Sequence, residues 1–375
     1  MSGLYLDNAA TTPVRREVLE AMAPLLTTTY GNPSSHHTVG ERAAAALDDA
    51  RRRVARVLGV RAGDVVFTSG GTEANNLAVK GIALAALQNT GARHVVTTPI
   101  EHESVLASID YLRRLHGVEV TMLPVDRHGL VDSDDLRRSI RPDTSVISIG
   151  LANNEIGTVQ DAGGLVDASG RVPLHLDAVQ AAGWLPLAGL GVDALTLAGH
   201  KLGAPKGIGV AMVRGRIPLE PVVHGGGQQR GRRSGTENVA GAVGIATALE
   251  LAESEREDAA ARVAGVRDAF IARVREKVPT AHLTGHPDRR LPGTASFTFA
   301  GTSGEAVLLE LERRGVVSSS GSACAAGSDD ASHVLVAIGV DPDVARTAVR
   351  FTLPHTWRGT LDPVADAVAA AVAAV

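Results

Sequence analysis

The sequence predicts an α/β fold, in which a large domain with a doubly wound, mostly parallel sheet precedes a smaller α+β domain. The first observation is that short apolar runs alternate with helix-like segments through residues 40–213. The second is that several of these runs are apolar on both faces, as strands buried between two helical layers are. The third is the length of 375 residues, which normally makes two domains or one large domain with a smaller partner.

The elements of the large domain follow from these apolar runs and from the helical spacing between them. Strands are predicted over 64–68, 94–98, 145–150, 173–177, 194–198 and 208–213. Helices are predicted over 40–58, 72–89, 102–116 and 133–140. A segment without proline then runs from about Glu237 to Val278 and predicts long helical structure that leads out of the large domain.

The smaller domain is predicted from the remaining residues, where strands and helices are mixed. Strands are expected over 294–299 and 316–318, and helices over 303–314, 332–338 and 362–374. The last of these segments is rich in alanine, but its valines recur at helical spacing. We therefore expect a docked helix there rather than a low-complexity tail.

Composition narrows the classes of function. A formal net charge of −4 offers no electrostatic footprint for nucleic acid or an anionic membrane, and 3% aromatic residues make base-stacking platforms unexpected. The chain has no apolar run of 18 residues and no basic and apolar leader. We expect no membrane segment, no secretory signal and a cytoplasmic location. The single cysteine, Cys324, excludes a disulfide within the chain and a metal site built from several cysteines.

The most informative stretch is 175–206. Asp177 ends an apolar strand there, and Gln180 follows it three residues later. A second apolar run delivers His200 and Lys201 into a glycine-rich turn. An acid and a lysine at successive strand ends suit pyridoxal 5′-phosphate (PLP), because the lysine forms a Schiff base and the acid keeps the pyridine nitrogen protonated. The alternative, an ordinary surface lysine, does not explain these neighbours.

The run SGGTE at 69–73 follows a predicted strand and opens a helix. Its glycines, including Gly71, allow close approach to the backbone, while the free N–H groups and the helix dipole favour an anion. Thr72 adds a hydroxyl. Such turns also occur without a ligand, so the prediction of a phosphate site depends on the nearby PLP lysine.

Polar residues follow two further predicted strands. His102 comes after strand 94–98, where it faces the ligand crevice of a parallel sheet. An imidazole at that place is suited to stack on a pyridine ring and to exchange protons with substrate. Asn154 lies in the NNE run at 153–155 and is suited to bind the cofactor's 3′-oxygen or a substrate carboxylate. The alternative for this run is an Asx turn.

Three more features have a chemical interpretation. Cys324 lies among small residues in SSSGSACAAGSDD, which predicts a flexible, exposed loop able to carry a thiol to a substrate. Arg350, on a predicted strand, is suited either to a bidentate clamp on a substrate carboxylate or to a structural ion pair. The loop 224–236 is glycine-rich and basic, as is typical of a loop that meets an anion.

In chain order, eight motifs resemble those of cysteine desulfurases, which are fold-type I PLP enzymes of the class V aminotransferase group. They are YLDNAATTP (5–13), GNPSSHHTVG (31–40), FTSGGTEANNLA (67–78), ANNEIGTVQ (152–160), HLDAVQAAG (175–183), AGHKLGAPKGIG (198–209), RRSGTENVAGAVG (232–244) and SSGSACAAGS (319–328). The resemblance covers essentially the whole chain, and the cysteine loop resembles the nitrogen-fixation and iron–sulfur-cluster type. Ala198 is a departure, because many members place a phosphate-binding serine there.

The resemblance implies a role for each candidate residue. His102 would stack on the ring and transfer protons, Arg350 would hold the substrate carboxylate, and Cys324 would be the nucleophile that becomes a persulfide. Lys201 would form the Schiff base, and Asp177 would pair with the pyridine nitrogen. Gln180 and Asn154 would reach the 3′-oxygen. The phosphate would be bound by Gly71, Thr72 and His200, and by Thr236 from a second subunit.

The resemblance also implies the architecture and the partners. A large domain over 15–255 would hold a mostly parallel, seven-stranded sheet flanked by helices, and residues 1–14 and 256–375 would form the small α+β domain with the cysteine loop. The protein would be a homodimer with active sites at its interface. It would remove sulfur from L-cysteine, giving L-alanine and a Cys324 persulfide.

The sequence leaves the sulfur acceptor open among iron–sulfur cluster assembly, tRNA or DNA thiolation and thio-metabolite biosynthesis. Other PLP chemistry also stays open, namely a selenocysteine lyase, a cysteine C–S lyase or an aminotransferase. A non-catalytic scaffold is a third hypothesis. A Cys324→Ala variant separates the first two hypotheses, and a colourless preparation without PLP would support the third.

Overall fold

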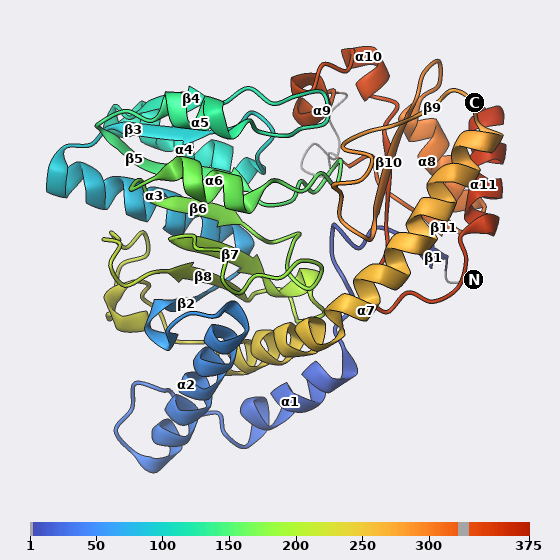
Figure 1. Ribbon diagram of the computed structural model, residues 1–375. Helices are drawn as coiled ribbons and strands as arrows, with labels where there is room; N and C mark the ends of the chain where they lie inside the picture. The colour runs from blue at the N-terminus through green and yellow to red at the C-terminus, as the bar shows by residue number, and fades with distance from the viewer. Residues whose placement is uncertain (1–2, 322–329) are drawn as a thin grey trace.

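The computed structural model describes residues 3–321 and 330–375, and its larger part has three layers (Figure 1). Within these residues a seven-stranded sheet forms the middle layer, with helices on both faces, as the sequence predicts. Its strands are β2 (Val65–Thr68), β3 (His94–Thr97), β4 (Glu119–Met122), β5 (Thr144–Gly150), β6 (Leu174–Asp177), β7 (Ala194–Ala198) and β8 (Gly209–Val213). The helices are α1 (Arg16–Thr27), α2 (Thr38–Leu58), α3 (Gly71–Thr90), α4 (Glu103–His116), α5 (Ser133–Ser139), α6 (Ala162–Ser169) and the first part of α7 (Val239–Lys277).

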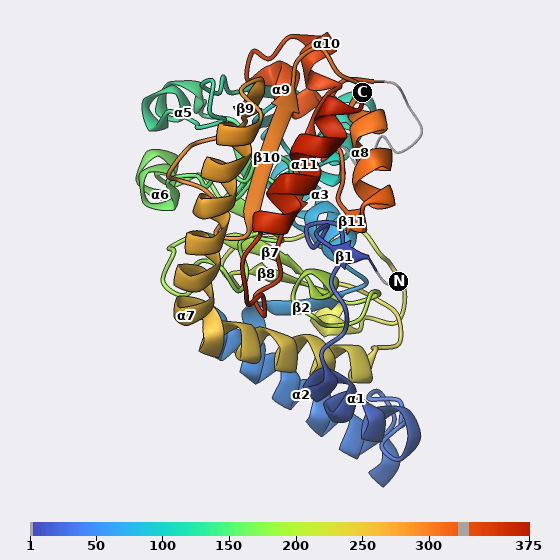
Figure 2. The same ribbon diagram turned by 90° about the vertical axis from the view of Figure 1, so that its right-hand side faces the viewer.

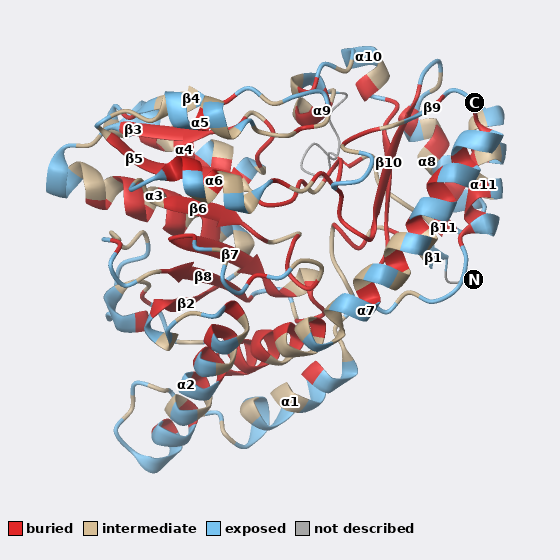
Figure 3. Cartoon of the chain, in the orientation of Figure 1, coloured by how far each residue is buried: buried red, intermediate tan, exposed pale blue. Residues whose placement is uncertain are grey.

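Alternate residues of the strands enter two different cores. Val95 and Val146 pack with α3 and α4 on one face. Val96 and Ile147 pack with α2 and α7 on the other face. Figure 3 shows the central strands buried along their length. Burial on both faces explains why these runs are continuously apolar rather than alternating.

The strand order is β2-β8-β7-β6-β5-β3-β4. Strand β8 is antiparallel to both of its neighbours, and the other pairs are parallel. The register sets Gly150 beside Asp177 and Asp177 beside Thr196. Because β2, β3, β5, β6 and β7 run in one direction, their carboxyl ends meet at one edge, which is where open α/β sheets bind ligands.

The predicted elements of the large domain are confirmed to within two residues at each end. The sequence analysis does not predict β4, α1 or α6. Strand β4 lies at the sheet edge and its residues are half-buried or exposed, so its apolar pattern is weak. Helix α1 contains Pro24, which is a helix-breaking signal in a sequence.

The smaller part of the molecule has two small sheets with helices packed around them. Strands β12 (Val349–Thr352), β10 (Thr294–Phe299) and β9 (Ala281–Leu283) are antiparallel, and β1 (Leu4–Tyr5) pairs in parallel with β11 (Val316–Val317). The helices are α8 (Gly304–Arg313), α9 (His333–Ala337), α10 (Pro342–Ala345) and α11 (Asp362–Ala373). Phe270 meets Phe297 and Phe351 edge to face in its core. Val364 and Val368 of α11 are buried there, so the predicted docked helix is confirmed.

Helix α7 belongs to both cores. Its residues up to Ala252 pack with the large sheet, and those from Val263 onward pack with the smaller core. Figure 2 shows the helix running from one part of the molecule to the other. Leu6, near the N-terminus, also lies in the smaller core. The domain boundary between residues 255 and 256 remains a prediction. Across residues 3–321 and 330–375, no helix combines the length and the apolar character needed to cross a membrane.

Candidate active site

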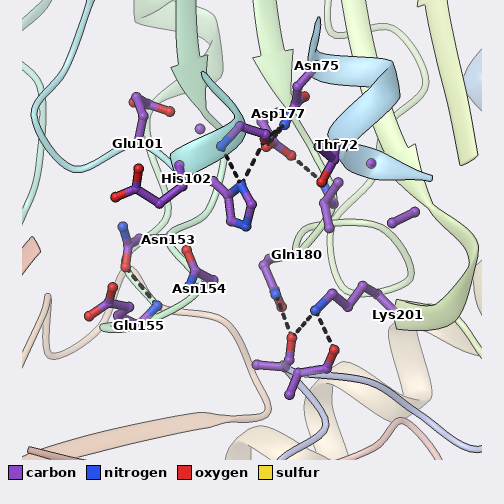
Figure 4. A pocket seen from close by; sticks show the side chains of 18 of the residues that line it. Thr72, Asn75, Glu101, His102, Asn153, Asn154, Glu155, Asp177, Gln180 and Lys201 are labelled. Carbon is purple, nitrogen blue, oxygen red and sulfur yellow. Dashed lines mark hydrogen bonds between the residues drawn. The ribbon is translucent and has the colours of Figure 1, made fainter. Parts of the chain in front are cut away.

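The candidate site is a cavity of about 760 Å³ at the carboxyl edge of the sheet (Figure 4). Its walls come from the ends of five strands and from β12 of the smaller part. Most of the residues predicted from the sequence line it: Gly71, Thr72, His102, Asn154, Asp177, Gln180, His200, Lys201 and Arg350. The fold therefore gathers side chains that lie up to 279 positions apart in the sequence, counted from Gly71 to Arg350 (350 − 71).

One wall is the N-terminus of α3, which follows β2 directly. Gly70 caps this helix without any side-chain hydrogen bond, so its first N–H groups are available to an anion. The loop fits tightly: a Cβ atom on Gly209 would lie 2.5 Å from the Gly70 carbonyl carbon. A Cβ atom on Gly71 would lie 3.0 Å from a Val179 methyl and 3.2 Å from Ala198. Glycine is therefore required at these positions for the shape of the loop 69–73, which we call the cup.

A half-buried ion pair lies beside the cup. The Glu73 carboxylate is 2.6 Å from the Arg233 guanidinium and accepts the Ser69 N–H at 2.8 Å. Burial raises the pKa of Glu73, but the hydrogen bonds from Arg233 and Ser69 outweigh it and hold that pKa below its usual value. The basic loop 224–236, which is predicted to meet an anion, therefore pairs with a carboxylate of the same chain. Arg233 of this loop balances the charge of Glu73.

Lys201 ends a short 3₁₀ turn, Gly199–Lys201, that follows β7. Its Nζ donates to the carbonyl of Ala10 at 2.7 Å and also to that of Ala9. The Gln180 amide donates to the same Ala9 carbonyl at 3.0 Å. The YLDNAATTP motif, which holds both alanines, therefore positions the amine from a segment distant in sequence.

His200 stands next to Lys201, and its Nδ1 lies 3.1 Å from the Thr11 hydroxyl. Burial lowers the pKa of His200 to about 4, and the charges of Lys201 and Lys206 act in the same direction. The imidazole is therefore neutral near pH 7. A neutral ring still offers one N–H to an anion such as a phosphate.

Asp177 ends β6, and only 9% of its surface is exposed. Its two carboxylate oxygens accept the Asn75 amide at 2.7 Å and the Val179 N–H at 2.9 Å. The sequence analysis did not single out Asn75. Its position in the second turn of a buried helix gave no signal apart from its polarity in an apolar environment.

His102 is the N-cap of α4. Its Nδ1 accepts the Ser104 N–H at 3.0 Å and lies 2.8 Å from the Ser104 hydroxyl. The opposite edge of the ring points into the cavity (Figure 4). His102 therefore follows a strand end and lines the cavity, while its chemical role remains a prediction.

The NNE run at 153–155 has two predicted interpretations, an Asx turn and a ligand contact. The Asn153 side chain accepts the N–H groups of Glu155 and Ile156 and donates to the Ile100 carbonyl, so it forms the Asx turn. Asn153 and Asn154 both line the cavity, and the Asn153 side chain is engaged in the turn.

Arg350 is almost fully buried, with 1% of its surface exposed. It forms an ion pair with Asp7 at 2.7 Å and donates to the carbonyls of Asn154 and Gly321. Its Nε has no partner among the described residues. Arg350 thus combines the structural ion pair with a position on the cavity wall, and the two sequence interpretations do not exclude each other.

One predicted residue lies elsewhere, and the position of another is not described. Thr236 is exposed and does not line this chain's cavity. Cys324 falls outside the described residues. Ser332 follows it in the chain and lines the cavity, where its hydroxyl donates to the buried Glu155 carboxylate.

Glu101 is a further cavity residue that the sequence analysis missed. It is 3% exposed, and its carboxyl group accepts the Thr98 hydroxyl at 2.6 Å. Burial raises the pKa of Glu101 to about 8, and the negative charge of Asp177 adds to the effect. Near pH 7 the group is therefore mostly a neutral acid. The sequence signal was weak because a glutamate beside a helix start is usually solvated.

Comparisons with known proteins agree with this geometry. Residues 4–354 match the family described as aminotransferase class-V. A cysteine desulfurase IscS from Dictyoglomus turgidum is 44% identical over 354 residues, which are 93% of this chain and 89% of that protein.

Solved structures give the same picture. A structure titled NIFS-like protein is similar with a TM-score of 0.89 and 35% identity, over 99% of both chains. A structure titled SspA in complex with cysteine is similar with a TM-score of 0.81 and 35% identity, over 93% of this chain and 98% of the other. Members of the class V and cysteine desulfurase families are PLP enzymes.

Proposed function

The chain belongs to the aminotransferase class-V family, and we propose that it is a PLP-dependent cysteine desulfurase. The observation that carries the proposal is the convergence of Lys201, Asp177, His102 and the α3 N-terminus on one cavity. Relatives that cover nearly the whole chain are named cysteine desulfurases.

The residues of the cavity fit PLP. The uncapped start of α3 and the cup that Gly71 keeps open suit a phosphate group. The Asp177 carboxylate, held by two N–H donors, suits a protonated pyridine nitrogen. When bound to Lys201, the cofactor supplies an electron sink for electrons released at the α-carbon of an amino acid.

The protein's own residues would orient the substrate and move protons. Arg350, which lines the cavity, would bind the substrate carboxylate. Lys201 would take the α-proton at Nζ, where the carbonyls of Ala9 and Ala10 hold it. His102 would stack on the ring and exchange a proton through the edge that faces the cavity.

Cys324 would carry out the sulfur transfer. Its thiolate attacks the sulfur of L-cysteine, and a new S–S bond forms while the substrate's C–S bond breaks. The electron pair of the broken bond stays with the substrate carbon, which takes up a proton. The substrate leaves as L-alanine, and Cys324 retains the persulfide for an acceptor. No external oxidant is needed, because the substrate carbon is reduced as the sulfur is oxidised.

We further propose a homodimer in which Thr236 reaches the partner's phosphate site, because this exposed threonine does not line its own chain's cavity. We also propose a cytoplasmic location, since a nucleophilic thiol must remain reduced between turnovers. The acceptor is a protein or other thiophilic molecule that takes the persulfide sulfur.

The test is alanine formation from L-cysteine with a reductant present, in wild type and Cys324→Ala. Alanine from wild type alone is the expected result. Equal alanine from both would contradict the desulfurase proposal and favour a lyase. No alanine from a wild-type protein that visibly retains PLP would mean that cysteine is not its substrate.

A further inference from the structure

The buried side chain of Asn75 connects two residues of the site, Asp177 and, through Ser104, His102. Its Nδ2 donates to Asp177 at 2.7 Å and to the Ser104 hydroxyl oxygen at 2.9 Å. The same Ser104 hydroxyl lies 2.8 Å from Nδ1 of His102. Asn75 is 2% exposed, so water does not replace these hydrogen bonds. Figure 4 shows Asn75 and Asp177 side by side, with His102 below them.

The orientation of the Asn75 amide follows from its neighbours. A carboxylate only accepts hydrogen bonds, so the atom that faces Asp177 must be the NH₂ group. The Asn75 oxygen then accepts the Thr196 hydroxyl hydrogen at 2.6 Å. Both ends of the amide are used, and a flipped amide would set an oxygen against the carboxylate.

We call the hydrogen-bonded series His175, Thr196, Asn75, Ser104 and His102 the relay. The hydrogen bonds at its His175 end are also fixed in direction. Because the Thr196 hydroxyl hydrogen is used on Asn75, the Thr196 oxygen accepts from Nε2–H of His175 at 3.0 Å. The other ring nitrogen of His175 then accepts the Ser148 hydroxyl at 2.9 Å. Burial lowers the pKa of His175 to about 4, so this ring is neutral and provides one donor and one acceptor as the relay needs.

At the Ser104 end of the relay, the hydrogen bonds fix which ring nitrogen of His102 carries the hydrogen. The Ser104 hydroxyl oxygen accepts from Asn75, and its hydrogen is directed to Nδ1 of His102, because that nitrogen already accepts the Ser104 backbone N–H. The Ser104 backbone N–H donates to the same Nδ1. A nitrogen that accepts two hydrogen bonds carries no hydrogen, so the neutral ring has its proton on Nε2.

We propose that Asn75 is a positioning residue that couples the two ends of the site: it holds the Asp177 carboxylate and, through Ser104, keeps the His102 proton on Nε2. His102 therefore presents an N–H hydrogen-bond donor to the cavity. The proton-accepting role at the α-carbon falls to Lys201. This inference rests on the proposed function for its chemical meaning, but the relay itself is measurable without substrate.

Two variants separate the two branches of the relay. Asn75→Leu removes all its hydrogen bonds at similar volume, whereas Ser104→Ala removes only the hydroxyl that serves His102. Asn76→Ala is the matched control, since among the described residues that neighbouring amide donates to the Thr72 carbonyl and does not contact the relay. The readouts are loss of PLP from the loaded protein on dialysis, the ¹⁵N tautomer signals of His102 identified by a His102→Gln variant, and the pH profile of kcat.

In wild type we expect a pyridine-like signal for Nδ1 and a pyrrole-like signal for Nε2. Asn75→Leu should lose PLP about tenfold faster, because a hydrogen bond to a carboxylate is removed. It should also raise the share of the other tautomer. Ser104→Ala should change the tautomer and the pH profile but retain PLP as wild type does, and Asn76→Ala should change none of these.

Wild-type PLP retention and an unchanged tautomer in Asn75→Leu would overturn the proposal. An Nδ1–H tautomer in the wild-type protein would overturn it as well. If wild type makes no alanine while the dialysis and ¹⁵N results are as expected, the proposed function fails but the relay stands.

Discussion

At the scale of single residues, Arg350 shows how one side chain serves both stability and binding. It is buried beside Asp7 and lines the cavity. Removing a guanidinium from such a pair leaves a carboxylate without its partner, which costs far more than losing an exposed ion pair. The two roles predict different responses to two substitutions.

We predict that Arg350→Ala lowers the free energy of unfolding by about 3–5 kcal/mol, measured by urea denaturation. Arg350→Lys should be milder in stability but should still raise KM for L-cysteine more than it lowers kcat, because an ammonium group cannot clamp a carboxylate bidentately. The control is Arg16→Ala, whose exposed pair with Glu20 should cost less than about 1 kcal/mol. An unchanged KM in Arg350→Lys would exclude the clamp.

Single residues also differ in how well the sequence predicts their roles. Lys201, Asp177 and His102 stand at or just after strand ends, and strand ends are visible in the local apolar pattern. Asn75 and Glu101 gain their chemistry from contacts with distant segments. No local pattern marks such residues, because the partners that define them are set only by tertiary packing.

At the scale of elements, the start of α3 determines the shape of the predicted phosphate site. This helix packs on the sheet through residues such as Ala78 and Val79, while its first turn opens onto the cavity. Small residues are needed where it passes Val179 and Ala198. A single methyl group is therefore enough to test the cup.

We predict that Gly71→Ala loses PLP on dialysis about tenfold faster than wild type, since the added Cβ would crowd Val179 and Ala198. Gly265→Ala is the matched control, because a Cβ there meets nothing within 4 Å on helix α7. That control should retain PLP and gain up to about 1 kcal/mol in stability. Equal PLP retention in both variants would show that the cup does not bind the phosphate.

The elements themselves were largely predictable. Doubly buried strands such as β5 leave strong apolar signals, and α7 is marked by a long segment without proline. Edge strand β4, with its half-exposed residues, and proline-containing α1 leave weak ones. The pairing of β1 with β11 joins residues 4–5 to residues 316–317, and two-residue strands carry no pattern from which to predict such a pairing.

At the scale of the whole molecule, the buried histidines predict how stability depends on pH. His175 is fully buried, and burial lowers its pKa from 6.5 to about 4. Between these values the unfolded chain binds the proton and the folded chain does not. Stability therefore falls as the pH decreases from about 6.5 toward 4.

We predict that wild type loses roughly 2 kcal/mol more free energy of unfolding between pH 7 and pH 5 than His175→Gln does. Glutamine can still accept from Ser148 and donate to Thr196, but it does not titrate. Urea denaturation at the two pH values gives the comparison. An identical pH dependence would mean that His175 is protonated in the folded protein.

The proposed dimer leads to a complementation test. A mixed dimer of Lys201→Ala and Thr236→Ala contains one fully wild-type site only if Thr236 acts across the interface. We predict about half of the wild-type activity per dimer in purified, doubly tagged mixed dimers. Activity no higher than that of the Thr236→Ala homodimer site would place Thr236 in its own subunit's site or outside catalysis.

The central claim is that Cys324 takes the sulfur of L-cysteine, and the chain offers a direct measurement because it has only one cysteine. The PLP-loaded protein would be given L-cysteine without reductant, and its intact mass recorded before and after treatment with a thiol. We predict a mass gain of one sulfur atom per chain, reversed by the thiol and absent in Cys324→Ala. Alanine formation without any mass gain on wild type would contradict the account.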